Sequence, residues 1–390
     1  EISENTIEFN KNKGMYVEDY LQDNGITYVK GRRGLKSLKT TLGKLKGKEF
    51  PIPDNINANL REYQKIGFSW LKTLDYLGFG GILGDEMGLG KTLQTITFLA
   101  SNEKALSLIV APTSLVYNWY KEFKKFASNI RVGILHSNRE ERESILKNRD
   151  KYDVLITTYN LIKRDIDLYK EIEFDYCILD EAQNIKNPSS QNAKSVKSIK
   201  SKNRFAFTGT PIENSLMELW SIFDFIMPGY LYDEKKFATR YHRRLEEDEC
   251  LIQDLNRLIK PFILRRYKKD VIKELPDKIE NRLIVPLDDE QLKVYSKYVK
   301  YIQDIIEKKV QDDELSKSKI EILSYITKLR QICLDPSIVM DDYKGGSGKI
   351  DALLETVVQS IDEGHKILVF SQFTSVLSNI SKVFKENEVS

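Results

Sequence analysis

The eight residues Asp85–Thr92 (DEMGLGKT) have the composition of a loop that binds a triphosphate. They follow a short apolar run, Gly81–Leu83, and precede a helical pattern over Leu93–Ala100. A strand, a glycine loop and a helix are therefore expected in that order. Gly88 and Gly90 let the backbone bend so that amide N–H groups point at the phosphates, and the N-terminus of the helix adds partial positive charge.

Two side chains of this loop are suited to ATP and magnesium. Lys91 is expected to bridge the β- and γ-phosphates, and the Thr92 hydroxyl to ligate Mg²⁺. One position departs from the usual GxxxxGK[ST] pattern, because Asp85 stands where the first glycine is expected and Gly84 comes one place early. The residues predicted to bind ATP in this loop are Asp85, Glu86, Met87, Gly88, Leu89, Gly90, Lys91 and Thr92.

A second polar cluster, Asp180-Glu181-Ala182-Gln183, directly follows the apolar run Tyr176–Leu179. Magnesium must be held near a phosphate loop by a carboxylate at the end of a strand. Asp180 is expected to bind this metal, and Glu181 to orient and activate the attacking water. The alternative is that these acids only stabilise the first turn of a helix, by up to about 1 kcal/mol. The phosphate loop about ninety residues upstream favours the catalytic interpretation.

Three weaker signals accompany these motifs. Gln64 precedes the phosphate loop, and its amide can both donate to and accept from an adenine edge, although an incidental helix residue would look the same. Pro112 and Thr113 follow the second apolar run and could grip a nucleic-acid backbone, or simply form a capped turn. The segment Thr208-Gly209-Thr210 places hydroxyls where a γ-phosphate could be sensed, although as a bare turn it would mean little.

The elements that must position these residues alternate between short buried runs and helical stretches. That alternation is typical of an α/β fold with a parallel sheet and helices on both faces, in which ligands bind at the carboxyl ends of the strands. Trp70, Trp119 and Trp220 fall in helical apolar patterns, so we expect them to pack in the core. The candidate strands are Gly81–Leu83, Leu106–Ala111, Val154–Thr158, Tyr176–Leu179 and Arg204–Phe207.

The remaining chain is expected to be helical, with one more strand. Residues 213–280 read as mainly helical, and apolar residues from Leu292 to Ile306 and from Ile322 to Cys333 recur every three or four positions, which predicts a helical hairpin. Gly345–Lys349 (GGSGK) follows no strand and is expected to be a flexible linker. Lys366–Phe370 (KILVF) has the pattern of another buried strand.

Composition excludes several classes of protein. The 390 residues are 41% hydrophobic and 31% charged, and no apolar run reaches the length that spans a bilayer, so an intracellular globular protein without a membrane partner is expected. The cysteines lack zinc-ribbon spacing. The net charge of +3 is too small to indicate nucleic-acid binding by itself. The basic run from Lys30 to Lys48 contains no acidic residue and would attract phosphates, unless it is a solvated linker.

Read together, these residues resemble the Swi/Snf ATPases of helicase superfamily two, of the bacterial or archaeal type. The resemblance runs through LREYQKIGFSWL, GILGDEMGLGKTLQTI, VAPTSLVYNW, LDEAQNIKN, FTGTPIENSLMELWSIFDFIMPG, FILRRYKKDVIKELPDK and HKILVFSQFTSVL, from about residue 58 to 377. It implies two RecA-like P-loop NTPase lobes that bind ATP and Mg²⁺ and step along double-stranded DNA, remodelling protein–DNA contacts. Asp at the start of the phosphate loop is this family's habit.

The resemblance also implies roles for individual residues. Pro112 and Thr113 would touch the DNA backbone, and Arg265 and Arg266 fall in a brace between the lobes. Gln183 stands where many relatives have His. The residues expected to couple the ATP state to DNA are Gln183, Thr208, Gly209 and Thr210.

The expected organisation is an upstream segment and basic linker over 1–55, and a first lobe over 56–285 with a helical insertion at about 213–280. A helical hairpin and linker over 286–345 and the start of a second lobe over 346–390 follow. The family's arginine-finger motifs would come after Ser390, so we expect this piece to bind ATP weakly and hydrolyse it poorly. Two alternatives stay open: a strand-separating helicase, and a nucleotide-gated DNA-binding scaffold.

Overall fold

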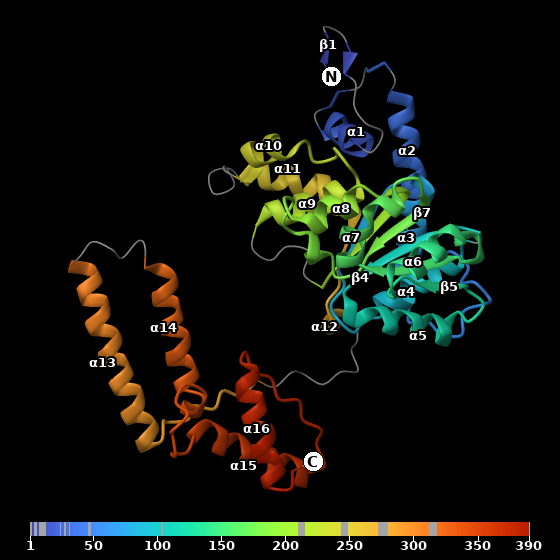
Figure 1. Cartoon of the computed structure of the whole chain (residues 1–390). Helices are drawn as coiled ribbons and strands as arrows, with labels where there is room; N and C mark the ends of the chain where they lie inside the picture. Colours follow the sequence, from blue (N-terminus) through green and yellow to red (C-terminus); the bar gives the residue numbers. More distant parts are fainter. Residues whose placement is uncertain are drawn as a thin grey trace. The chain divides into compact units, whose positions relative to one another are not determined.

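The computed structural model describes residues 2–3, 6–7, 13–23, 25–26, 29–30, 32–45, 48–102, 104–209, 215–242, 249–271, 280–311 and 318–389. The chain divides into two compact units, Glu1–Pro276 and Asp277–Ser390 (Figure 1). The finer division expected from the sequence, with boundaries near 55, 285 and 345, stays a prediction. None of the described helices is both long enough and apolar enough to cross a bilayer.

The first unit is built on one parallel sheet. Within the described residues this sheet has seven strands in the order β5-β6-β4-β7-β8-β3-β9, and every pairing is parallel. The strands are β3 (Gly81–Leu83), β4 (Ser107–Ala111), β5 (Val132–Ile134), β6 (Val154–Thr158), β7 (Glu173–Leu179), β8 (Lys200–Phe207) and β9 (Ile263–Leu264). The five expected strands are confirmed. Sequence reading missed β5 and β9, because runs of three and two residues are too short to stand out.

Burial explains why these segments are strands. Every residue of β4 and β6 is buried, and in the register Ile109 of β4 lies beside Ile156 of β6 and Ile178 of β7. Phe98 of the helix after β3 packs edge-to-face on Phe205, with 5.3 Å between ring centroids. The carboxyl ends of parallel strands meet at one edge of the sheet, so the loops after β3, β4, β7 and β8 are brought to the same edge.

Helices flank the sheet and make its crossovers (Figure 1). The described residues between 215 and 271 are mainly helical, as expected, but β9 lies among them. Short 3₁₀ turns join several elements: Thr113–Leu115, Arg149–Lys151, Ala182–Ile185 and Lys260–Phe262. The helices are α3 (Glu62–Leu77), α4 (Lys91–Ala100), α5 (Val116–Phe126), α6 (Arg139–Lys147), α7 (Tyr159–Tyr169), α8 (Gln191–Lys197), α9 (Leu216–Ile226), α10 (Glu234–Phe237), α11 (Glu249–Ile259) and α12 (Lys268–Val271), with a π-helical turn over Ala238–His242.

The expected linker before residue 55 is wrong in part, because this region contains regular structure. Strands β1 (Ile2–Ser3) and β2 (Thr6–Ile7) pair, and helices α1 (Gly14–Asp23) and α2 (Arg32–Leu45) follow. Most of the basic run therefore lies on α2. The Arg32 guanidinium of α2 binds the Glu18 carboxylate of α1 at 3.0 Å. The numerous lysines hid a helical spacing of leucines at positions 35, 38, 42 and 45.

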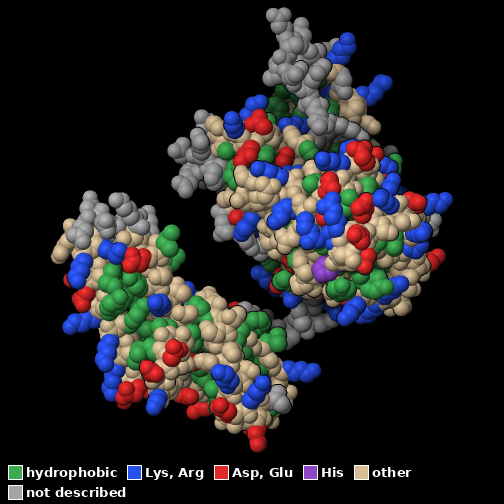
Figure 2. Space-filling view, viewed as in Figure 1, with side chains coloured by type: hydrophobic (Ala, Val, Ile, Leu, Met, Phe, Trp, Pro, Cys, Tyr) green, Lys and Arg blue, Asp and Glu red, His purple; other side chains and the backbone are tan. Residues whose placement is uncertain are grey.

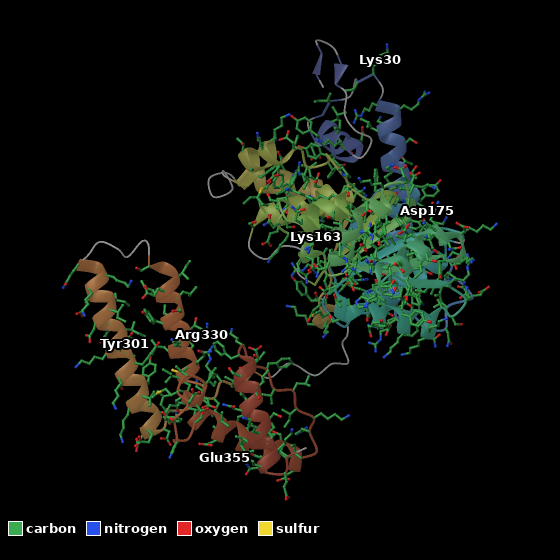
Figure 3. The ribbon with its side chains drawn as sticks, viewed as in Figure 1. Lys30, Lys163, Asp175, Tyr301, Arg330 and Glu355 are labelled. Carbon is green, nitrogen blue, oxygen red and sulfur yellow. The ribbon has the colours of Figure 1, made fainter. Side chains whose placement is uncertain are left out.

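The second unit, within its described residues, is helical. Its elements are α13 (Asp289–Gln311), α14 (Lys319–Ile332), a 3₁₀ turn at Pro336–Ile338, α15 (Gly348–Asp362) and α16 (Thr374–Glu386). The expected pair of amphipathic helices is confirmed, and in Figure 3 Tyr301 is labelled on α13 and Arg330 on α14. Tyr301 meets Tyr325 of α14 edge-to-face, with 6.4 Å between ring centroids. Ile350, Val376 and Ile380 form a small core.

Two expectations for this unit are wrong. The GGSGK segment is not wholly a linker, because Ser347 caps α15 and the helix begins at Gly348. Lys366–Phe370 forms no strand, and Leu368 and Phe370 are 82% and 86% exposed. A strand needs a neighbour to pair its backbone N–H and C=O groups, and the described part of this unit contains no strand that could supply one.

The Ser347 cap can be tested by replacing Ser347 with alanine. The Ser347 hydroxyl accepts from the Ile350 N–H at 3.3 Å and donates to the Leu334 carbonyl at 2.5 Å. Losing a cap of this kind costs about 1 kcal/mol, so the amides in the first turn of α15 should exchange with solvent about five times faster. Ser360→Ala in the same helix is the control, and equal exchange rates in the two variants would contradict the cap.

Candidate nucleotide site

The phosphate-loop motif has the expected local geometry. It leaves β3 at Leu83 and enters α4 at Lys91. Gly88 and Gly90 have φ angles of 86° and 76°, in the left-handed region where side chains are strained. A Cβ atom on Gly90 would also lie 2.4 Å from Nε2 of Gln64. Both glycines are therefore required by the loop, as the sequence predicted.

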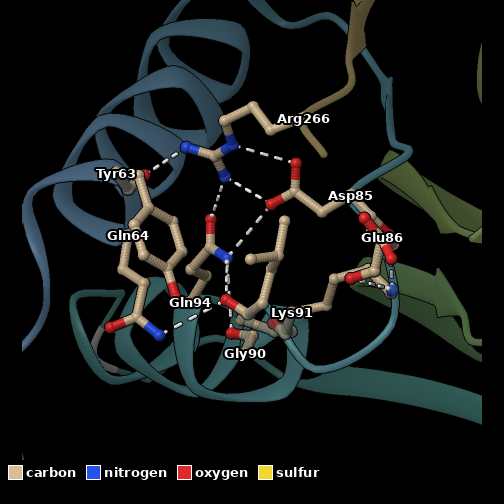
Figure 4. Close-up of polar contacts among 10 residues, drawn as sticks. Tyr63, Gln64, Asp85, Glu86, Gly90, Lys91, Gln94 and Arg266 are labelled. Atoms are coloured by element: carbon tan, nitrogen blue, oxygen red, sulfur yellow. Dashed lines mark hydrogen bonds and ion pairs between the residues drawn. The ribbon is translucent and has the colours of Figure 1, made fainter. Parts of the chain in front are cut away.

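Asp85, the residue that departs from the glycine pattern, is wholly buried and paired with Arg266 (Figure 4). Nε of Arg266 donates to Oδ1 of Asp85 at 2.9 Å, and a second N–H of the guanidinium binds the other carboxylate oxygen. Arg266 also donates to Oε1 of Gln94 at 2.8 Å and to the Tyr63 carbonyl. Both oxygens of the Asp85 carboxylate thus bind the Arg266 guanidinium, and this pairing anchors the start of the loop.

The two arginines of the LRR segment differ in environment. Arg266 lies inside the first unit, and its partners Asp85, Gln94 and Tyr63 come from the phosphate loop and the helices beside it. Arg265 is exposed, with its guanidinium 4.9 Å from the centroid of the Tyr267 ring. The resemblance alone assigned both to one brace, because sequence does not show which of two adjacent side chains points inward.

The segment after β9 runs alongside the first half of the phosphate loop. The Gly84 N–H donates to the Leu264 carbonyl at 2.7 Å, and the Glu86 N–H donates to the Arg266 carbonyl at 3.0 Å. The Glu86 carboxylate in turn accepts from the Lys268 N–H at 2.7 Å. The β3–β9 pairing therefore continues past both strands and fixes the start of the loop.

Lys91 lies across the loop, where its ammonium donates to the Asp85 carbonyl at 2.7 Å. Burial lowers the pKa of Lys91 from its ordinary value, and the surrounding carboxylates, with Glu181 the largest contributor, act in the opposite direction. Thr92 lies next to it in the first turn of α4 and is partly exposed. Both residues are at the positions that the motif predicts.

The other predicted loop residues contribute unequally. Met87 is 64% exposed at the tip of the loop. Leu89 is fully buried, and its carbonyl accepts from Nε2 of both Gln64 and Gln94 at 3.3 Å. Only the backbone of Leu89 is therefore available to the site. Gln94 was not singled out from the sequence, because a buried Gln in an apolar helix gives no distinctive pattern.

Gln64, expected to bind adenine, has protein partners on both amide atoms. Its Oε1 accepts from the Arg61 N–H at 2.9 Å, and its Nε2 binds the Leu89 carbonyl. The side chain is 8% exposed. It therefore ties the start of α3 to the phosphate loop (Figure 4).

The strand-end acids lie where the sequence placed them, directly after β7. The Asp180 carboxylate accepts from Nε1 of Trp119 at 2.7 Å and from the Glu181 N–H at 3.0 Å. Burial raises the pKa of Asp180, and the Trp119 hydrogen bond acts to lower it. Glu181 adopts a left-handed backbone with φ 51°, which is strained for this residue type and lies where the chain leaves β7.

Two residues that hold Asp180 in place escaped the sequence analysis. Trp119 is buried as expected, but it also orients the Asp180 carboxylate through its indole N–H. Tyr159 donates its hydroxyl to the Asp180 carbonyl at 2.7 Å. Trp119 and Tyr159 lie 61 and 21 residues from Asp180, so no local pattern could have found them.

A hydrogen-bonded chain links Glu181 to the end of β8. Nε2 of Gln183 donates to the Glu181 carboxylate at 2.7 Å, and the Thr208 hydroxyl donates to Oε1 of Gln183 at 3.0 Å. Gly209 follows, and a Cβ atom there would lie 3.6 Å from Cγ of Met87. Three of the predicted coupling residues are thereby brought together, and Thr210 lies outside the described residues.

The predicted DNA-contacting residues lie at the end of β4. Pro112 is partly buried, and Thr113 is exposed at the start of the 3₁₀ turn Thr113–Leu115. They therefore lie at the same carboxyl edge of the sheet as the nucleotide residues.

Relatives support the assignment of the fold. The profile of the SNF2-related domain matches residues 63–338. An uncharacterized ATP-dependent helicase of Mycoplasma genitalium is 38% identical over 87% of this chain and 32% of its own length. The ISWI chromatin-remodeling complex ATPase ISW2 of Saccharomyces cerevisiae is 34% identical over 82% of this chain and 30% of its own length. The chain thus spans about a third of the length of these curated relatives.

A solved structure agrees with this result. The Sulfolobus solfataricus SWI2/SNF2 ATPase core in complex with dsDNA is 39% identical, with a TM-score of 0.56, and the match covers 87% of this chain and 73% of that one. It confirms the RecA-like parallel fold that the resemblance implied. The family match includes the phosphate loop, the acids after β7 and the arginine after β9. This chain therefore belongs to the SNF2-related family of ATPase cores.

Proposed function

We propose that this chain is the ATP-binding part of a DNA-stimulated ATPase that translocates on double-stranded DNA and remodels protein–DNA complexes. The observation that carries the proposal is the pairing of a phosphate loop with strand-end acids at one edge of the sheet. The loop follows β3 and the acids follow β7, with only β8 between these two strands. Such a site binds a triphosphate and activates water for attack on it.

Each residue has a role that follows from its placement. Lys91 leaves the Asp85 carbonyl and binds the β- and γ-phosphates when ATP enters. Glu181 holds the attacking water, since its carboxylate is pinned on one oxygen by Gln183 and is free to accept on the other. Gln64 contributes to adenine binding by exchanging its contact with Leu89 for one with the base.

Mg²⁺ fits the donors that this site offers. The Thr92 hydroxyl and the Asp180 carboxylate are oxygen ligands, which magnesium prefers, and magnesium usually keeps several waters and takes phosphate oxygens as further ligands. When bound, the ion neutralises charge on the phosphates. Trp119 and the Glu181 N–H hold the Asp180 carboxylate in one orientation, so this ligand is preorganised.

DNA binding is proposed from the position of Pro112 and Thr113 and from the relative solved with dsDNA. The surface charge adds little support for DNA binding, because basic and acidic side chains are interspersed on the visible face of the first unit (Figure 2). The chain Glu181–Gln183–Thr208 then gives a route by which the ATP site and the DNA edge influence each other. Partner proteins on DNA are expected for the remodelling activity.

The mode of action is tested with the full-length parent protein. Because a translocase moves along an intact duplex, we expect ATP-dependent displacement of a third strand from triplex DNA without separation of a duplex of the same length. Duplex unwinding would instead indicate a helicase. A scaffold would be indicated if duplex DNA leaves the ATPase rate unchanged while bound nucleotide changes the affinity for DNA.

The catalytic assignment is tested by Glu181→Gln and Lys91→Ala in the parent. Loss of the group that activates water should lower the DNA-stimulated ATPase rate by about 100-fold or more, and loss of the lysine should also weaken ATP binding. Glu173→Gln is the matched control, because Glu173 is exposed at the opposite end of β7. Unchanged rates in the Glu181 and Lys91 variants would remove the motor assignment.

A further inference from the structure

We propose that Lys268 is a second phosphate-binding cation of the nucleotide site, and that Arg266 is the residue that positions it. The inference rests on the proposed role of the phosphate loop. A Cβ atom on Gly88 would lie 3.1 Å from Cε and 3.3 Å from Nζ of Lys268. The ammonium group therefore lies over the glycine of the loop, in a segment of the kind whose backbone amides bind phosphates.

The Lys268 ammonium has no acid of its own. Among the described residues it makes no hydrogen bond and no ion pair within 4.0 Å, although its backbone N–H is fixed by the Glu86 carboxylate. The side chain is nevertheless partly buried. The Lys268 ammonium is held over an anion-binding loop without a negatively charged partner in the described part of the protein. It is therefore suited to pair with an anionic ligand, and a phosphate group is such a ligand.

Arg266 determines where Lys268 stands. It precedes Lys268 by two residues, and its carbonyl accepts from the Glu86 N–H while its guanidinium grips Asp85. The absence of a side chain at Gly67 makes room for this arrangement, since a Cβ atom there would lie 1.8 Å from Oε1 of Gln94 and 2.8 Å from Nη2 of Arg266. Residues 264–268 are therefore joined to the phosphate loop along one hydrogen-bonded strip.

The binding specificity of Lys268 follows from its location. Loop amides of this kind surround the α- and β-phosphates, so a cation over Gly88 contacts ATP and ADP alike. It contributes nothing to adenosine, whose base lies outside the loop. Lys268 thus differs from Glu181, which acts on the attacking water. A change at Lys268 should alter nucleotide affinity, whereas a change at Glu181 should alter the rate of hydrolysis.

The test uses this chain and measures its affinity for Mg·ATP, Mg·ADP and adenosine by calorimetric titration. Lys268→Ala should weaken ATP and ADP by about tenfold, the value of one charge-assisted hydrogen bond, and leave adenosine unchanged. Lys269→Ala is the matched control, because Lys269 is the exposed neighbour. Unchanged or tighter ATP binding by the Lys268 variant would overturn the inference, and tighter binding would show that this lysine excludes phosphate.

The positioning role of Arg266 is measured in a double-mutant cycle. Arg266→Lys keeps a charge beside Asp85 but cannot make the paired contacts, so it should weaken ATP binding at least as much as Lys268→Ala does, because Arg266 also anchors the loop. If Arg266 positions Lys268, the double variant should lose less affinity than the sum of the two single losses, whereas additive losses would refute positioning. Lys91→Ala distinguishes failure of this inference from failure of the proposed function. If Lys91→Ala also leaves ATP affinity unchanged, the proposed function fails. If Lys91→Ala weakens ATP binding while Lys268→Ala does not, only this inference fails.

Discussion

The buried ion pair between Asp85 and Arg266 is the constraint on which the nucleotide site depends. Two charges removed from water are tolerated only if they pair and fill their remaining hydrogen-bonding capacity, and Gln94 and the Tyr63 carbonyl complete that requirement here. A glycine at position 85 would leave the arginine buried without a counter-charge. Because the partners are 181 residues apart, the phosphate loop acquires its anchor only when β9 has docked beside β3.

The order of the strands in the sheet determines how the residues of the site are laid out beside the Asp85–Arg266 pair. In the order β7-β8-β3-β9, the residues at the carboxyl ends are Glu181, Thr208, the phosphate loop and Arg266. Neighbouring strands thus carry the residues for which neighbouring roles are proposed: water activation, coupling and phosphate binding, with loop anchoring by Arg266 beside them. The chain order is different, since β3 comes first. Parallel pairing, with its one-sided carboxyl edge, is what brings together groups that the sequence separates.

Local signals predicted a large part of this arrangement. The strands before Asp85 and Asp180 are short buried runs, and the glycines at 88 and 90 have positive φ because the turn requires it. Contacts between distant elements carry no such signal. Trp119 reads as a core residue until its indole N–H is seen on Asp180, and β9 is too short to recognise without β3 beside it. Lys366–Phe370 shows the converse, because an apolar run predicts a strand only if a partner strand is present.

The Glu181–Gln183–Thr208 chain shows how a substitution within a family pattern can preserve a connection. An amide carries a donor and an acceptor at once, so Gln183 gives its N–H to a carboxylate and accepts from a hydroxyl. A neutral imidazole, which the resemblance places here in many relatives, also has one donor and one acceptor, but it gains a proton near neutral pH and then has no acceptor left for Thr208. Glutamine does not titrate, so it keeps one donor and one acceptor at every pH. The link between the ends of β7 and β8 therefore does not depend on a titrating bridge.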